Sequence, residues 1–298
     1  MNNPYFRGVP WQRFMEFISP SADRFAVIKK ILEEAALPHR VIEMAGSRHI
    51  IITSSPVSPG QTLGRRKPVI LVAHYDRAEG SPGANDNSAG VFLLLETAIK
   101  LESGKVKNWL VILTDKEELK EGEGLEIQGA YTLGLSFKNT KMENSSIFCF
   151  DACGVGDTLV ISTTADLLLR KEKGGEKLQK SVLELQKLAL DTARNLGMVK
   201  VLLAPTPFSD DAGFLRAGLA AQNITMLPSE ECNPLVAELR KNPAFAEVLI
   251  SAESRKSSRI LSIPETWRGL NSPSDSHLRL TPENFRTVVR FAEELCRG

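Results

Sequence analysis

Cysteine is scarce in this sequence, and so is histidine. Only four cysteines occur in 298 residues, and Cys149 and Cys153 are not matched by a second pair at the spacing of a zinc ribbon. The sequence therefore predicts neither a disulfide framework nor a cysteine-ligated structural zinc. Free thiols in a reducing cytoplasm are the simplest interpretation, because a chain of this length can bury a large core without crosslinks.

Long apolar runs and an excess of either charge are also missing. No run approaches the roughly 18 residues that a membrane-spanning helix needs. Arg7, Arg13 and Glu16 interrupt the start of the chain, where a signal peptide would be apolar. The 37 lysines and arginines nearly balance the 36 aspartates and glutamates, which gives a formal net charge of +1. We therefore expect a cytoplasmic protein with neither a membrane nor a nucleic-acid partner.

The apolar segments that are present alternate between strand-like and helix-like patterns. The strand-like runs occupy residues 40–43, 50–53, 68–74, 109–114, 146–151, 158–163, 201–204 and 220–225. The helix-like segments occupy residues 9–36, as two short helices, and 88–101, 178–196 and 281–296. Continuous apolar runs are typical of strands buried on both faces of a sheet. The alternation predicts an α/β fold with a central, mostly parallel sheet.

No segment has the composition of a linker between two domains. Residues 1–298 are therefore expected to form a single domain. The segment 228–257 is polar and helical in parts, and we interpret it as an insertion in that domain rather than a domain of its own.

Polar residues gather where the predicted strands end. They are His74, Asp76, Asp86, Glu117, Glu118 and Asp151. The carboxyl ends of parallel strands meet at one edge of a sheet, and functional groups of open α/β folds collect there. One imidazole among several carboxylates is a suitable donor set for a divalent metal ion.

The spacing of these residues suits distinct roles. His74 and Asp76 are two apart on an extended chain, so one can bind a metal while the other orients it. Glu117 and Glu118 are adjacent and point differently, so one can bind a metal while the other acts as a base toward water. Each motif alone has an ordinary alternative as a surface pair or a solvated turn. Their common position at strand ends favours a metal site.

The segment 71–90, LVAHYDRAEGSPGANDNSAG, resembles the co-catalytic zinc aminopeptidase family. That family includes bacterial leucyl aminopeptidases, related carboxypeptidases and glutaminyl cyclases. Its pattern is a strand ending in His-x-Asp, then Pro-Gly-Ala-x-Asp-Asn before a helix, and later a Glu-Glu pair. Weaker resemblances follow at Asp151, at residues 209–211 and at residues 271–276. The resemblance implies a three-layer sandwich, with helices on both faces of a mixed sheet, as in zinc exopeptidases.

The resemblance also implies one or two bound zinc ions, with manganese or cobalt as alternatives. His74 and Asp151 would hold one ion. Glu118 and the residue at Asn271 would hold the other, and Asp86 would bridge the two.

Two further residues would assist the reaction without binding the metal. By the resemblance, Glu117 would be the general base that takes a proton from a metal-activated water, and Asp76 would orient His74. The peptide bond between Asp86 and Asn87 would be cis.

Two histidines of the family pattern are missing here. Asn271 and Asp211 stand in their places, and an amide oxygen is a poorer zinc ligand than an imidazole. His277, six residues beyond Asn271, could replace the missing ligand, and a solvated role is its alternative. We therefore expect one tightly bound ion at the His74 position and a second that binds weakly or not at all.

The resulting functional prediction is a metal-dependent exopeptidase, an aminopeptidase that hydrolyses short peptides or amino-acid amides. The main alternative is an inactive homologue that acts as a binding or regulatory protein, with its site decayed at Asn271 and Asp211. Glutaminyl cyclase-like amide cyclisation is a third interpretation. It fits poorly, because Asn271 replaces a histidine that holds the zinc of those enzymes. The sequence leaves open the oligomeric state, the side-chain specificity, and the choice between aminopeptidase and carboxypeptidase action.

Overall fold

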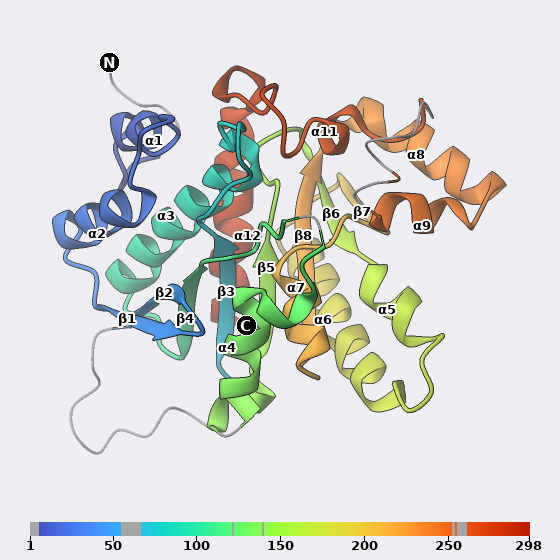
Figure 1. The fold of residues 1–298 in the computed structure, drawn as a ribbon, viewed down its shortest axis with the longest axis horizontal. Coiled ribbons are helices and arrows are strands. Elements are labelled where there is room, and N and C mark those ends of the chain that lie inside the picture. The colour runs from blue at the N-terminus through green and yellow to red at the C-terminus, as the bar shows by residue number, and fades with distance from the viewer. Residues whose placement is uncertain (1–5, 55–66, 121, 139, 252–253, 255–260) are drawn as a thin grey trace.

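The computed structural model describes residues 6–54, 67–120, 122–138, 140–251, 254 and 261–298, and its middle layer is a β-sheet (Figure 1). The strands are β1 (His39–Met44), β2 (Ser47–Thr53), β3 (Val69–His74), β4 (Trp109–Thr114), β5 (Ser146–Phe150), β6 (Thr158–Ser162), β7 (Val201–Ala204) and β8 (Ala221–Leu227). Within the described ranges the strand order is β1-β2-β4-β3-β5-β8-β6-β7.

The sheet is mixed, and its centre is parallel. Strands β4, β3, β5 and β8 run parallel to one another, and β6 is parallel to β7. The hairpin β1–β2 joins β4 antiparallel, and β6 is antiparallel to β8. The prediction of a mostly parallel, mixed sheet is therefore confirmed.

Helices cover both faces of the sheet, as the three-layer prediction requires. The α-helices of the described ranges are α1 (Trp11–Phe17), α2 (Arg24–Glu34), α3 (Gly90–Ser103), α4 (Gly129–Lys138), α5 (Thr164–Leu169), α6 (Glu176–Asn195), α7 (Asp210–Arg216), α8 (Ser229–Lys241), α9 (Phe245–Ile250), α11 (Glu265–Arg268) and α12 (Phe285–Arg297). Helices α3, α6 and α12 pack on one face, with α1 and α2 beside α3 (Figure 1). Helices α4 and α7 pack on the other face.

The central strands are apolar on both sides because each side meets a layer of helices. In β3, Leu71 and Ala73 belong to the core under α3 and α12, whereas Ile70 and Val72 belong to the core under α4 and α7. All four are buried. This arrangement explains why the sequence shows a continuous apolar run rather than an alternation.

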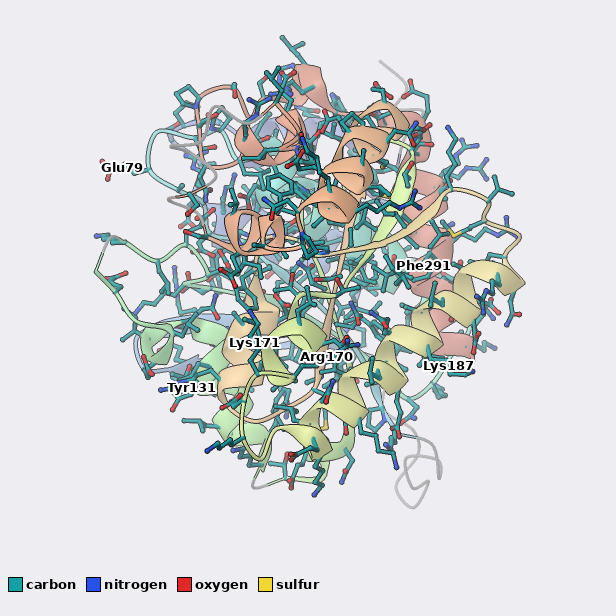
Figure 2. All side chains as sticks on the ribbon, turned by 90° about the vertical axis from the view of Figure 1, so that its right-hand side faces the viewer. Glu79, Tyr131, Arg170, Lys171, Lys187 and Phe291 are labelled. Atoms are coloured by element: carbon teal, nitrogen blue, oxygen red, sulfur yellow. The ribbon has the colours of Figure 1, made fainter. Side chains whose placement is uncertain are left out.

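The covering helices are amphipathic. Figure 2 labels Lys187 on α6 and Phe291 on α12. Lys187 is exposed and forms an ion pair with Asp191 one turn later. Phe291 is fully buried, and its ring centroid lies 6.4 Å from that of Phe150 on β5. Among the described residues, no helix is both long and apolar enough to cross a membrane.

A separate apolar cluster joins α8, α9 and α11 to the edge of the sheet. Leu235, Phe245 and Trp267 pack there with Val160 of β6 and Leu227 of β8. Part of the segment 228–257 thus shares a core with the sheet, and residues 252–253 and 255–257 of it lie outside the described residues. Its interpretation as an insertion stays a prediction.

Candidate metal centre

The ends of three neighbouring strands bring the candidate residues together. Strand β3 lies between β4 and β5 and is parallel to both. His74 is the last residue of β3, Glu117 and Glu118 follow β4, and Asp151 follows β5. The grouping of these side chains at one sheet edge is therefore as the sequence predicted.

His74 is the centre of this cluster and is fully buried. Its Nε2 atom lies 3.1 Å from Asp86 Oδ1, 3.7 Å from Asp151 Oδ1 and 4.0 Å from Glu117 Oε2. Its Nδ1 atom lies 3.3 Å from Asp76 Oδ1. One ring nitrogen therefore faces three carboxylates, while the other faces the carboxylate that the sequence assigned to orienting the ring.

Three of the side chains have the geometry of a ligand set. His74, Asp86 and Glu118 each offer a ligand atom, and these atoms lie within 4.8 Å of one another. Glu118 Oε1 is buried without a hydrogen-bond partner among the described residues. A buried carboxylate oxygen without a donor is costly. The cluster therefore fits a divalent cation.

The pKa values of the carboxyl groups in the cluster also indicate a site for a cation. Burial raises the pKa of Glu118 to about 9, and the nearby Asp86 carboxylate adds to the rise. Burial also raises the pKa of Glu117 well above its ordinary value, with Glu118 and Asp151 contributing. Burial would lower the pKa of His74, but its contacts with Asp151, Asp76 and Asp86 outweigh this and raise it. Without a cation, protons must balance this concentrated negative charge.

Asp76 contacts both His74 and the Glu117–Glu118 pair. Besides facing His74, its two carboxylate oxygens accept hydrogen bonds from the backbone amides of Glu117 (3.2 Å) and Glu118 (3.0 Å). Burial would raise the pKa of Asp76, but the contact with His74 and these two amides lower it overall. Asp76 therefore holds the Glu117–Glu118 pair in place as an ionised carboxylate.

Asp275 holds the turn that carries Asp86 in the way that Asp76 holds the Glu117–Glu118 pair. Its carboxylate accepts hydrogen bonds from the amides of Asn85 (2.8 Å) and Asp86 (3.0 Å). Asp275 is not among the site residues predicted from the sequence. The available signal was its position four residues after Asn271, inside the segment that resembles a family motif.

The turn that carries Asp86 departs from regular helix. Residues Ala84–Ala89 form an irregular π-type turn, in which Asp86 and Asn87 have non-helical dihedral angles. The peptide bond between these two residues is cis, as the sequence resemblance implied. Asn87 Nδ2 donates to the carbonyl of Phe150 at 2.8 Å, which ties the turn to the end of β5.

Asn271 and His277 lie in the C-terminal segment that Asp275 ties to Asp86. Asn271 has a φ of +57°, and its Oδ1 atom is buried without a hydrogen-bond partner among the described residues. His277 begins a short 3₁₀ turn, His277–Arg279. The unpartnered oxygen is compatible with Asn271 as a weak ligand, and both roles stay predictions.

Two further carboxyl groups are buried at the start of α7. Burial raises the pKa of Asp210 to about 7 and that of Asp211 to about 8. Thr114 Oγ1 donates to Asp210 at 2.6 Å, and the amide of Ser209 donates to Asp211 Oδ1 at 2.9 Å. Asp211 replaces a family histidine, and its Oδ2 atom, like Asp210 Oδ1, is buried without a hydrogen-bond partner among the described residues.

Substitution of Asp211 by asparagine is expected to stabilise the protein increasingly as pH rises. The pKa of Asp211 is about 8 in the folded state and about 4 when unfolded, so its contribution to stability is complete below pH ~4 and is lost toward pH ~8. Asparagine keeps the oxygen that accepts from Ser209 and cannot ionise. Thermal unfolding with chelator should therefore show the variant's Tm advantage growing by at least about 3 °C from pH 5 to pH 8.

The half-buried surface residue Asp191, whose pKa is lowered by its hydrogen bond with Lys187, supplies the control for this measurement. The Tm difference between Asp191→Asn and the wild type should not grow over the same pH range. A pH-independent difference for Asp211→Asn would show that the Asp211 carboxyl ionises normally in the folded protein.

Comparison with known protein families tests the family resemblance that the sequence motifs indicate. The sequence model described as Peptidase family M28 matches residues 55–247, which is more than half of the chain. The chain belongs to peptidase family M28. The resemblance drawn from residues 71–90 and the Glu-Glu pair is thereby confirmed. No curated protein sequence gives a significant match to this M28 chain.

Solved structures of related proteins share the fold of this M28 chain. A leucine aminopeptidase precursor from Bacteroides thetaiotaomicron is 14% identical, with a TM-score of 0.62 over 100% of this chain and 99% of that chain. A glutaminyl cyclase from Porphyromonas gingivalis is 15% identical, with a TM-score of 0.61 over 99% of both chains. At these identities the likeness shows the M28 fold and not a shared substrate.

A zinc aminopeptidase from Bacillus subtilis has a similar fold in part of a longer chain. It is 20% identical, with a TM-score of 0.54, and the match covers 83% of this chain and 49% of that chain. The M28 chain described here therefore spans about half the length of that aminopeptidase.

Proposed function

We propose that this chain is a metal-dependent exopeptidase, an aminopeptidase that acts on short peptides or amino-acid amides. The observation that carries the proposal is the buried cluster in which His74, Asp86 and Glu118 offer ligand atoms within 4.8 Å of one another. Membership of peptidase family M28 supports a peptide hydrolase. The aminopeptidases among the related structures support the choice of reaction.

The side chains of the cluster divide into ligands and assisting residues. His74 and Asp151 would hold one divalent ion, Glu118 and Asn271 a second, and Asp86 would lie between them. When bound, such an ion supplies a Lewis acid that polarises an amide carbonyl and makes water a better nucleophile. Zinc is the expected ion, and manganese and cobalt suit the oxygen-rich donor set as well.

Glu117 is assigned the proton transfer. Its Oε2 atom lies 4.0 Å from His74 Nε2, while Gln128 Nε2 donates to its Oε1 at 3.3 Å. Glu117 would take a proton from the attacking water and deliver it to the leaving amine. Asp76 would keep His74 oriented and the Glu117 backbone fixed through the contacts described above.

Metal content and amide hydrolysis measured on the same sample test this proposal. Protein purified without chelator is expected to carry at least one divalent ion per chain and to hydrolyse some aminoacyl amides in a fluorogenic panel with zinc, manganese or cobalt. Bound metal without hydrolysis would instead favour a binding or regulatory protein. Cyclisation of N-terminal glutamine peptides would favour the cyclase interpretation.

A further inference from the structure

Arg24, the first residue of α2, places its guanidinium beside the metal centre. Arg24 lies outside the segment that matches the M28 family model, and it is only 7% exposed. Its guanidinium makes five hydrogen-bond contacts with residues 75–88, the connection between β3 and α3, and three of them share the two N–H groups of Nη2. The acceptors are the carbonyls of Tyr75 (3.1 Å), Asp76 (2.9 Å), Pro82 (2.9 Å) and Gly83 (3.4 Å) and the hydroxyl of Ser88 (3.0 Å).

The two ends of the guanidinium hold different parts of this connection. Nη1 binds the carbonyls of Tyr75 and Asp76, directly after His74, and Nη2 binds the segment around Asp86 through Gly83 and Ser88. A guanidinium is planar, and its donors have a fixed fork geometry. One rigid group therefore sets the spacing between the two chain segments that carry His74 and Asp86.

The charge of Arg24 suits this position. Burial lowers its pKa to about 9, with Arg77 adding to the decrease and Asp76 and Asp86 opposing it, so the side chain is charged at neutral pH. Its guanidinium carbon also lies 4.6 Å from the centre of the Phe17 ring, which supports the group from α1.

Attachment of the N-terminal helices does not depend on Arg24 alone. Arg77 donates to the carbonyls of Ile18 (3.2 Å) and Pro20 (2.7 Å), between α1 and α2. The buried carboxylate of Glu96 accepts from the amide of Gly8 at 2.7 Å. In contrast, every hydrogen bond of Arg24 described above ends within residues 75–88.

We propose that Arg24 is a positioning residue of the metal centre, whose forked donors preset the His74 and Asp86 ligand atoms for a divalent cation. The inference rests on the proposed metal-dependent function, because it assumes that these two side chains are ligands. Its consequence is that helix α2, outside the family-matched segment, takes part in metal binding. Lysine would keep the charge but not the fork, so it should not replace arginine here.

The equilibrium affinity for zinc, measured by chelator competition, tests the proposal. Arg24→Lys and Arg24→Met should each weaken zinc binding by about tenfold or more, the size expected for residues that orient ligands. The visible spectrum of the cobalt-loaded variants should also change, because ligand geometry changes. The matched control is Arg13→Met on α1, which removes ion pairs with Glu16 and Glu34 at the surface and should change neither readout.

A milder variant covers the case in which the Arg24 variants do not fold. Ser88→Ala removes one of the five acceptors, together with the hydrogen bond that the Ser88 hydroxyl donates to the carbonyl of Gly83 at 2.5 Å. It leaves the guanidinium in place, and it should weaken zinc binding several-fold. Unchanged affinity and spectrum in Ser88→Ala would then overturn the proposal.

The remaining outcomes distinguish the forked geometry of the Arg24 side chain from its charge. They also distinguish the role of Arg24 from the proposed hydrolytic function. Wild-type affinity in Arg24→Lys would overturn the proposal, because it would show that charge alone suffices. A fall in thermal stability with unchanged affinity and spectrum would also overturn it, since that is a purely structural effect. Hydrolysis is measured on the same samples. A wild type that binds zinc without hydrolysing any substrate would contradict the proposed function, while the affinities still decide the role of Arg24.

Discussion

Replacement of Glu117 by glutamine is expected to lower kcat for amide hydrolysis by about 10²–10⁴-fold, the usual contribution of a positioned general base. Glutamine keeps the shape of the side chain and still offers an oxygen to Gln128, but it does not accept a proton. Zinc content should stay unchanged, because the compact ligand group is formed by His74, Asp86 and Glu118. Steady-state kinetics and metal per chain, measured on one sample, check both parts.

Glu126→Gln is the matched control for this substitution. Glu126 follows the same strand, but it is exposed and pairs with Arg216 at 2.7 Å, so its loss should leave kcat unchanged. Equal turnover by Glu117→Gln and an active wild type would show that another group moves the proton. A loss of zinc in Glu117→Gln would show that Glu117 is a ligand and not the base.

The central strands could be predicted from the sequence because both of their faces are covered. The run at 109–114 coincides with β4, and the runs at 68–74 and 146–151 differ from β3 and β5 by one residue each. A strand buried on two sides must be apolar at every position, so its boundaries are visible without knowledge of its neighbours.

Helices α4 and α7 could not be predicted in the same way. Helix α4 contains Gly129 and Gly134, and glycine weakens the helical signal of a sequence. A Cβ atom at Gly134 would lie 2.8 Å from the Cβ of Ala217. The residue is small because α7 packs closely there, and that contact depends on a segment far along the chain.

Tertiary contacts also moved two helix starts. The sequence places a helix start at Thr281, and a 3₁₀ turn, Pro282–Asn284, does begin directly after it. The hydroxyl of Thr281, however, accepts from the amide of Gly156 at 2.9 Å instead of capping the turn, and the regular helix α12 begins only at Phe285. The helix predicted from residue 88 begins at Gly90, because the irregular turn that carries Asp86 comes first. In both cases a long-range contact or the site overrides the local capping signal.

The candidate site was predictable where its residues follow strands or lie in the segment 71–90, and not where they come from other parts of the chain. His74, Glu117 and Asp151 are found by the rule that parallel strands end at one sheet edge. Arg24 and Asp275 reach the same turn from the two ends of the chain, and Asp275 lies 190 residues beyond Asn85, to which it binds. The contact of Arg24 leaves no local pattern in the sequence, and the signal for Asp275 is its place in the segment that resembles a family motif.

Asn271 stands where the family pattern has a histidine, and of the differences from that pattern we expect this one to affect metal binding most. Its backbone φ of +57° is left-handed, and asparagine and histidine are both enriched at such positions. The backbone therefore accepts histidine without added strain. Imidazole is also a stronger zinc ligand than an amide oxygen.

Asn271→His is therefore expected to tighten binding of the second zinc ion by roughly 100-fold, at the upper end of changes common at metal centres. Metal per chain after dialysis should rise from about one ion to two, as follows from this affinity change. Glycine at position 271 suits a positive φ but offers no ligand atom, so Asn271→Gly should weaken binding of the second ion further. The wild type should lie between the two variants.

Asn108→His separates a completed site from adventitious binding by an added imidazole. Asn108 also has a left-handed φ of +68°, but it precedes β4 and so lies at the opposite end of that strand from Glu117 and Glu118. This control should leave the metal content at the wild-type value. Two equally tight ions in the wild type would show that the amide of Asn271, or another group, already completes the second position. A single ion in Asn271→His would instead place residue 271 outside the metal centre, and the proposed two-ion ligand set would then be wrong.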